Sequence, residues 1–541
     1  MWQQHLPIFP IAIPLLTAAL MLLLRDKNRQ IKIALGGLSL ALQFLVALTL
    51  LGMADGSIDT NWLHGVGVYL LGDWPAPFGI VVVVDRLAAL MLVITCILAS
   101  TTWWYATARW DRAGVHFHPL FQLLIMGLNG AFLTGDLFNL FVFFEVFLAA
   151  SYGLMLHGSG RDRVRAGLHY IAVNLLASFL LLIAIALIYG VTGTLNMADL
   201  AAKVGLLSGG DRRLFEAAAA ILGIAFLIKA AAWPLNYWLI DTYANASPPV
   251  AAMFAIMTKV GVYSLLRIGS LLVPTGAPAA FGGEWMFPVG IATLAFGSFG
   301  LLATHQPERM ASYCIVISSG TLLAALGMPG VTLTGPALYY LLSSVPATAA
   351  FFMLLEMVGR AQTFGSDLLA VSQEAFELTD PESEDSSDDV IGIAIPAAMV
   401  FLGMSFIACA LLIIGLPPLS GFVAKLSLLS AALKASGATG NAWILTTTVL
   451  VSGFIGLMAF SRTGIRLFWS FSDIKVPRLR LNEALPVASL IGVCVVLTMR
   501  AGPIIQYLEQ TAAYLDTPSS YISAVLARDS IRPVHEGSVN D

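Results

Sequence analysis

The sequence predicts an all-α integral membrane protein with about fourteen transmembrane helices. Three observations predict this class. Hydrophobic residues make up 58% of the 541 residues and charged residues only 11%, whereas an average chain carries about 25% charged residues. The apolar residues form long continuous runs, which indicate helices rather than the alternating strands of a barrel. Basic residues gather in alternate loops between these runs, which is typical of multi-pass proteins.

Composition also excludes several kinds of function. The net charge of −4 is too small to indicate nucleic-acid binding. The sequence contains no nucleotide-binding glycine loop, paired CxxC motif or haem-ligand pattern, so we expect no cofactor. We also expect no metal site, because the cysteines stand singly in apolar runs without the spacing of metal ligands. These cysteines are Cys96, Cys314, Cys409 and Cys494.

The candidate membrane spans follow one another along the whole chain. The run at 395–433 is too long for one straight span and contains Pro417 and Pro418, so we expect one broken helix there. The run at 216–239 contains Lys229 and Pro234, and we expect it to be broken as well, because proline removes a helix hydrogen bond. The runs of spanning length are 7–24, 33–53, 79–104, 117–134, 137–156, 168–190, 216–239, 248–273, 286–304, 310–328, 335–358, 395–433, 442–465 and 484–502.

Basic loops predict the orientation in the membrane. They follow the odd-numbered spans, which places them on one face, and we expect that face to be cytoplasmic in a bacterial inner membrane. The loop at 54–78 contains no lysine or arginine and should lie outside, as should both termini. The loop at 191–215 is a mild exception. The basic residues are Arg25, Lys27, Arg29, Lys32, Arg109, Arg112, Arg161, Arg163, Arg165, Lys475, Arg478 and Arg480.

The two broken helices suggest an internal repeat. They lie five spans apart, and an odd offset means opposite membrane orientations, so we expect inverted repeats of spans 4–8 and 9–13.

A polar stretch from Glu374 to Asp389 cannot bury a core and predicts a cytoplasmic linker. The expected units are N-terminal helices at 1–110, the first repeat at 111–275, the second repeat at 284–359 and 393–470, the linker at 360–392, a last helix at 471–503 and a tail at 504–541.

Four charged residues lie deep inside apolar runs, namely Glu145, Lys229, Lys259 and Lys425. A lysine at bilayer depth costs roughly 2.5–3.5 kcal/mol on insertion scales, so it needs a partner or a hydrated cavity. A glutamate near Lys229 would hold that lysine charged, and lysine titrates readily when desolvated. The four residues therefore predict a proton relay near the midplane. The alternative is that the lysines snorkel to the interface.

Other polar residues near the spans have simpler explanations. His169 opens a span and is a candidate for access to the relay, although an interfacial histidine is the alternative. Asp85 is followed by Arg86, and a local ion pair accounts for it as well as a functional role does. Arg267 and Glu356 lie near helix ends, where we expect them to reach the interface.

Several motifs resemble one family over nearly the whole chain. The motifs are LFNLFVFFEVF around Glu145, KAAAWPLNYWL from Lys229, SPPVAA, MTKVGVYSLLR around Lys259, RMASYCIVISSG and LPPLSGFVAKLSLL around Lys425. They are similar to those of the antiporter-like membrane subunits shared by Mrp-type cation/proton antiporters and respiratory complex I. Within this family the acidic insert resembles most the D-type subunit of Mrp antiporters, also called Pha or Mnh.

The resemblance implies fourteen helices, inverted repeats and a Glu–Lys pair beside a lysine relay. It implies a secondary transporter subunit, not an enzyme, that carries protons in exchange for Na⁺ or K⁺ beside subunits of the A, B, C, E, F and G types. Two positions depart from many complex I members: Ser318 stands where a histidine is often found, and Lys425 where a glutamate is common. Ser318 would then have to work with water.

Two other functions stay open at this point. One is an ion-pumping membrane-arm subunit of an NADH dehydrogenase or a membrane-bound hydrogenase. The other is a structural scaffold whose buried lysines are inert.

Overall fold

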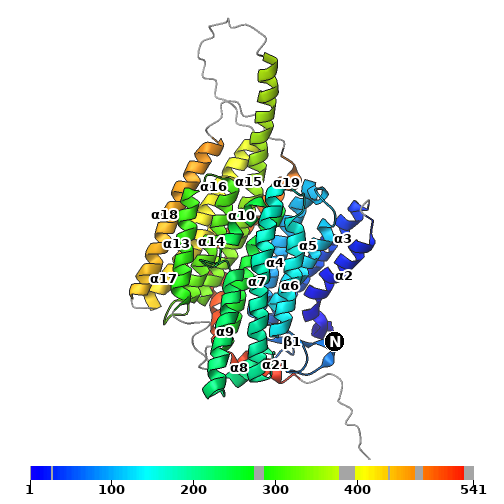
Figure 1. The fold of residues 1–541 in the computed structure, drawn as a ribbon, viewed down its shortest axis with the longest axis vertical. Coiled ribbons are helices and arrows are strands. Elements are labelled where there is room, and N and C mark those ends of the chain that lie inside the picture. Colours follow the sequence, from blue (N-terminus) through cyan, green and yellow to red (C-terminus); the bar gives the residue numbers. More distant parts are fainter. Residues whose placement is uncertain are drawn as a thin grey trace, which may run out of the picture.

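The chain forms a bundle of long helices in the computed structural model (Figure 1). The structure describes residues 2–25, 28–272, 285–376, 397–435, 439–468 and 479–528. Within these ranges, twelve helices are long and apolar enough to cross a membrane. The expected all-α, multi-pass membrane fold is therefore confirmed. Parts of the expected linker (377–392) and tail (529–541), with Lys27, Lys475 and Arg478, lie outside the described residues.

Most helices agree with the apolar runs. The helices that form the twelve candidate spans are α2 (Phe9–Leu23, which continues the short helices before it), α3 (Arg29–Asp55), α4 (Arg86–Arg109), α6 (Leu137–Met155), α7 (Arg161–Thr192), α11 (Pro248–Leu272), α13 (Met286–Ala303), α14 (Pro307–Leu326), α15 (Thr334–Phe376), α16 (Ala397–Ile414), α18 (Gly440–Phe468) and α19 (Leu481–Met499). The shorter ones are α1 (Trp2–His5), α5 (Phe117–Leu133), α8 (Met197–Val204), α20 (Ala501–Leu515) and α21 (Ser519–Leu526).

The count of fourteen spans stays a prediction. It would add to the twelve the apolar helix α5, which is too short, and the broken helix at 209–245, whose first part carries several charged residues. Helix α15 continues to Phe376, into the stretch expected to be a linker, and Figure 1 shows it projecting beyond the bundle.

Both expected helix interruptions are present. Helix α9 (Gly209–Lys229) ends at its lysine, and α10 (Tyr237–Asn245) begins after a gap that contains Pro234. Helix α16 ends at Ile414, and α17 (Ser420–Ala435) begins after Pro417 and Pro418. In Figure 1, α9 and α17 lie in the lower half of the bundle and α10 and α16 in the upper half. Each broken helix thus changes course near mid-height.

The predicted start of the third span at 79 is wrong. Val81–Val84 is a strand, β2, that pairs antiparallel with β1 (Gly67–Leu70), with Gly67 opposite Val84. A run of β-branched valines suits a strand as well as a membrane helix, and periodicity does not separate the two in four residues. Helix α4 begins only after Asp85, whose Oδ1 accepts the Ala88 amide at 2.9 Å as an N-cap.

Asp85 pairs with Arg267 and not with its neighbour Arg86, so the expected local ion pair is wrong. Arg267 Nη1 and Nη2 donate to the two carboxylate oxygens of Asp85, each at 2.6 Å. Arg86 instead pairs with Asp55 at 2.8 Å. Arg267 is 5% exposed, so the expectation that it reaches the interface is also wrong. The pair ties α4 to α11, and the Tyr521 ring of α21 lies over the guanidinium at 5.3 Å.

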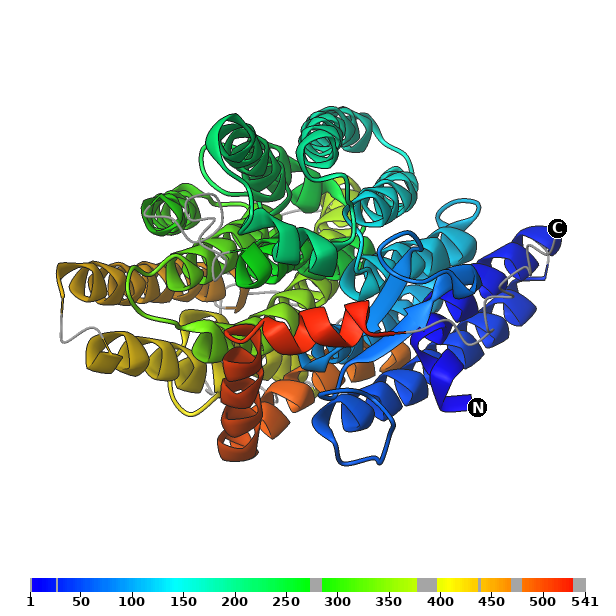
Figure 2. The same cartoon turned by 90° about the horizontal axis from the view of Figure 1, so that it is seen from below.

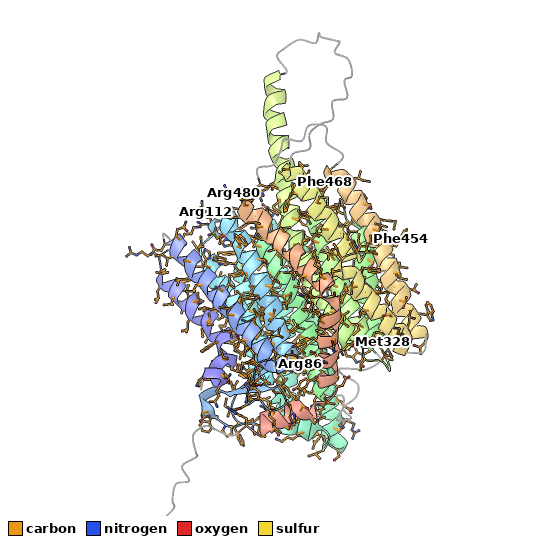
Figure 3. The ribbon with its side chains drawn as sticks, turned by 180° about the vertical axis from the view of Figure 1, so that it is seen from behind. Arg86, Arg112, Met328, Phe454, Phe468 and Arg480 are labelled. Carbon is orange, nitrogen blue, oxygen red and sulfur yellow. The ribbon has the colours of Figure 1, made fainter. Side chains whose placement is uncertain are left out.

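The two ends of the bundle differ in character. The N-terminal helix, the hairpin formed by β1 and β2, and α21 lie at one end. Figure 2 shows α21 running across that face. Arg112 and Arg480 lie at the opposite end (Figure 3). There, Glu356 accepts a hydrogen bond from Tyr105 and pairs with Arg360 at 2.7 Å.

Candidate functional site

The four charged residues singled out in the sequence lie on four different helices of the bundle. Glu145 is in α6, Lys229 ends α9, Lys259 is in the middle of α11, and Lys425 is in α17. Lys229 is 5% and Lys259 2% exposed, so neither snorkels to an interface. Lys425 is partly buried. The question is therefore which polar atoms compensate each buried amine.

Lys229 is held where α9 stops. Its Nζ lies 3.4 Å from the Asn174 carbonyl oxygen and 3.4 Å from Ser178 Oγ, both on α7. The ammonium also lies over the Phe144 ring, 5.4 Å from its centroid, which provides a cation–π contact. These are weak, long contacts, so the amine is not locked by any one partner.

Glu145 follows Phe144, whose ring lies 5.4 Å from the Lys229 Nζ, so the two charged residues belong to the same region of the bundle. Within the described residues no ion pair joins them, because no oxygen of Glu145 comes within 4.0 Å of an amine. Glu145 Oε1 is buried and has no hydrogen-bond partner in the part of the chain that the structure describes. The structure therefore shows no direct contact between the Glu145 carboxyl group and the Lys229 amine among the residues that it describes.

Lys259 faces the next helix along the bundle. Its Nζ donates to Ser319 Oγ of α14 at 3.3 Å. Two residues further, Gly261 allows α11 to approach the end of α9, since an added Cβ would lie 2.6 Å from the Ala230 nitrogen and 2.9 Å from the Lys229 carbonyl carbon. The close approach of the two backbones brings the helices that carry Lys229 and Lys259 together.

Serine pairs continue from Lys259 toward α17. Ser318 Oγ donates to Ser344 Oγ at 3.0 Å, which joins α14 to α15. Ser343 Oγ and Ser420 Oγ lie 2.8 Å apart, which joins α15 to α17. Consecutive residues on a helix point about 100° apart. A serine doublet therefore reaches two neighbouring helices at once.

Lys425 lies at the end of this series of polar side chains, beside the break between α16 and α17. Its Nζ donates to the Ile414 carbonyl at 2.6 Å and to the Ile413 carbonyl at 3.3 Å. These are the last carbonyls of α16, which have no helical partner because the helix stops there, and a helix C-terminus favours a cation. Gly421 lets the start of α17 approach the end of α16 closely, because a Cβ at that position would lie 1.9 Å from the Leu412 oxygen.

His169 does not join the cluster. It is exposed on α7 and forms no hydrogen bond or ion pair with any residue that the structure describes. Among the site residues, sequence reasoning missed Asn174, Ser178, Ser319, Ser343, Ser344 and Ser420. The available signal was the pair of serine doublets, at 318–319 and 343–344, each inside an apolar helix.

Comparisons with known proteins agree with this geometry. Residues 134–452 match the family described as NADH:quinone oxidoreductase/Mrp antiporter, TM, and this range contains all four charged residues. A Rhizobium meliloti protein, named as a probable K⁺/H⁺ antiporter component of the D type, is 49% identical over 97% of this chain and 98% of its own length. An Alkalihalophilus pseudofirmus protein, named as the D-type component of a Na⁺/H⁺ antiporter, is 31% identical over 97% of this chain and 100% of its own length.

A solved structure, that of the Mrp complex from Dietzia sp. DQ12-45-1b, contains a chain with the same fold. Its TM-score is 0.79 at 28% sequence identity, and the match covers 97% of this chain and 100% of the Dietzia chain.

Proposed function

The chain belongs to the NADH:quinone oxidoreductase/Mrp antiporter transmembrane family, and we propose that it is the proton-translocating D-type component of a multisubunit antiporter that exchanges Na⁺ or K⁺ for protons. The names of the relatives at 49% and 31% identity support this proposal. It works beside subunits of the A, B, C, E, F and G types in a bacterial plasma membrane. Both termini lie outside, and the repeats at 111–275 and 284–470 are inverted. The opposite courses of the two broken helices support the inversion.

The observation that carries the proposal is the series of polar atoms between Lys259 and Lys425. It runs from Lys259 Nζ to Ser319, through the Ser318–Ser344 pair and the Ser343–Ser420 pair, to the break where Lys425 is bound. Hydroxyls both donate and accept, so a proton passes along them when water bridges adjacent pairs. Four helices, α11, α14, α15 and α17, contribute polar side chains to this series.

The chemistry requires amines that gain and lose protons at bilayer depth. Lysine does so readily when desolvated, and three such lysines are held by long or shared hydrogen bonds rather than by direct ion pairs. The charge of Glu145 favours the protonated form of Lys229. A change in its surroundings therefore alters how tightly Lys229 holds its proton. That coupling is the means by which a neighbouring protein of the complex drives transport.

A redox function is the second candidate, since the family description also names NADH:quinone oxidoreductase. Purification of the complex separates the two. Small hydrophobic antiporter subunits accompany the chain in one case, and iron–sulfur proteins in the other.

Cation-driven pH change in vesicles that hold the complete complex tests the proposal. Lys229→Ala and Glu145→Gln should abolish or strongly reduce the change while the complex still assembles. If the Lys229→Ala complex exchanged cations for protons at the wild-type rate, the lysines would be inert and the chain a scaffold.

A further inference from the structure

A second polar feature lies away from the relay, between α3 and α5. Its members are Ser39, Gln43, Gln122 and Asn129, which are 2%, 1%, 0% and 0% exposed. Amides at membrane depth are costly unless they are hydrogen-bonded. Four polar side chains in one place therefore call for a physical explanation that the relay does not supply.

The four side chains form a hydrogen-bonded chain with a single direction. Asn129 Nδ2 donates to Gln43 Oε1 at 3.1 Å, Gln43 Nε2 donates to Ser39 Oγ at 3.0 Å, and Ser39 Oγ donates to Gln122 Oε1 at 3.1 Å. Among the residues that the structure describes, Gln122 Nε2 at one end has no partner, and neither has Asn129 Oδ1 at the other end. The Asn129 end is thus a fully buried acceptor without a donor.

A backbone carbonyl joins the Asn129 end. Pro14 lies inside α2 and has no N–H, so the carbonyl four residues earlier, that of Pro10, lacks its helical partner. Asn129 Nδ2 donates to this carbonyl at 2.9 Å. Three helices, α2, α3 and α5, therefore meet at one amide group.

Rotation of the Asn129 side-chain amide by half a turn changes which of its atoms faces the Pro10 carbonyl and Gln43 Oε1. The rotation exchanges Nδ2 with Oδ1, because the two ends of an amide have nearly the same shape. The Asn129 oxygen then joins the Pro10 carbonyl and Gln43 Oε1 around one position. Neutral oxygens of this kind, including carbonyls freed by a helix break, are the ligands that transporters and channels use for alkali cations.

The electrostatic surroundings also suit a cation. Pro10 is the second residue of α2, near the end of the bundle that carries the hairpin. The loop at 54–78 at this end contains no lysine or arginine and carries Asp59 and Asp73, besides Asp55, which pairs with Arg86. A surface with an excess of acidic groups raises the local concentration of cations. The relay, in contrast, is built on lysines, which repel a cation.

We propose that the Pro10 carbonyl, Gln43 and Asn129 form a binding site for an alkali cation, Na⁺ or K⁺, reached from the end of the bundle that carries the hairpin. The inference rests on the proposed antiport function for the choice of an alkali cation as the ligand. It assigns to this chain a cation site that is separate from the proton relay.

Equilibrium binding of ²²Na⁺ and ⁸⁶Rb⁺ (a K⁺ analogue) to the purified complete complex tests the site. Asn129→Leu removes the unpaired oxygen. Pro14→Ala restores an N–H that engages the Pro10 carbonyl within α2, so it removes a ligand while it favours the helix. We expect binding of one of the two cations to weaken at least about tenfold in each variant, which corresponds to one lost ligand.

Gln122→Leu is the matched control, because it breaks the other end of the same hydrogen-bonded chain and leaves the three oxygens in place. Binding should persist in this variant. Equal binding in wild type and Pro14→Ala would overturn the proposal, and equal loss in Gln122→Leu would show that the amides only hold the helices together. The complex with Lys229→Ala should still bind the cation, so failure of this site and failure of the antiport function are distinguishable.

Discussion

The hydroxyl of Ser343 in α15 lies 2.8 Å from the hydroxyl of Ser420, the first residue of α17. Ser420 directly follows the break at Pro417 and Pro418, and Lys425 lies little more than one turn further along the same helix. A single hydrogen bond thus connects the central helix of the bundle to the segment that carries the last lysine. This contact and three others lead to specific expectations.

Removal of either hydroxyl should slow proton transfer to Lys425. For Ser343→Ala and Ser420→Ala we expect a fall in cation-driven pH change of roughly tenfold to a hundredfold, at the low end of the effect of a lost positioned proton donor. Because the two act as one pair, the double variant should be little worse than either single one. Ser430→Ala is the control, since Ser430 only donates to the Ser427 carbonyl of its own helix. An unchanged rate in Ser420→Ala would exclude the pair from the path.

The pair of Asp85 and Arg267 should be important for stability. Arg267→Leu leaves a buried carboxylate without its partner, and such losses cost about 3–5 kcal/mol. We expect a clear fall in the thermal midpoint of the purified complex, and the double variant with Asp85→Asn should lose less than the sum of the single ones. The control is Arg86→Ala, which breaks a more exposed pair with Asp55 worth about 0–1 kcal/mol. A smaller effect for Arg267→Leu than for Arg86→Ala would contradict the structure.

The close approach of α11 to α9 should depend on Gly261. Gly261→Ala places a methyl group 2.6 Å from the Ala230 nitrogen, so the two helices must move apart. We expect a loss of about 1–3 kcal/mol in stability from overpacking, together with slower transport, because Lys229 and Lys259 separate. Gly403→Ala, where nothing lies within 4 Å, should be neutral or slightly stabilising. Melting curves and vesicle transport assays of both variants test the expected loss of stability and the expected fall in transport rate.

His157, in the loop between α6 and α7, should make stability depend on pH. Burial lowers the pKa of this imidazole below its usual value of about 6.5, although its Nε2 also bonds the Trp110 carbonyl at 2.9 Å, which opposes the shift. The unfolded chain then binds more protons at mildly acidic pH, so this stabilisation is present above about pH 6.5 and is lost as the pH falls below that value. The melting temperature of the wild type should therefore fall more between about pH 7.5 and 5.5 than that of His157→Gln. Parallel pH profiles would contradict this assignment.

The fold class and the buried charges were predictable from the sequence, because both depend on local signals. A long apolar run indicates a spanning helix, and a lysine inside it stands out by its cost. The helix breaks were visible for the same reason, since Pro234, Pro417 and Pro418 interrupt apolar runs. The start of α4 was not predictable in this way, because four valines fit both a strand and a helix.

The partners of the charges were not predictable, because they come from residues far apart in the chain. Asp85 and Arg267 are separated by 182 positions, and the nearer Arg86 looked like the natural partner. Ser343, Ser344 and Ser420 are small polar residues of a kind that is common in membrane helices. Their hydrogen-bonded pairing appears only when α14, α15 and α17 are placed side by side.

The most direct test of the proposed relay is the replacement of Lys259, whose Nζ donates to Ser319 where the serine series begins. The measurement is the cation-driven pH change in vesicles with the complete complex, in which Lys259→Met is compared with Lys434→Met, an exposed lysine of α17. The account predicts that Lys259→Met stops the exchange while Lys434→Met exchanges at the wild-type rate. Exchange at the wild-type rate in an assembled Lys259→Met complex would contradict it.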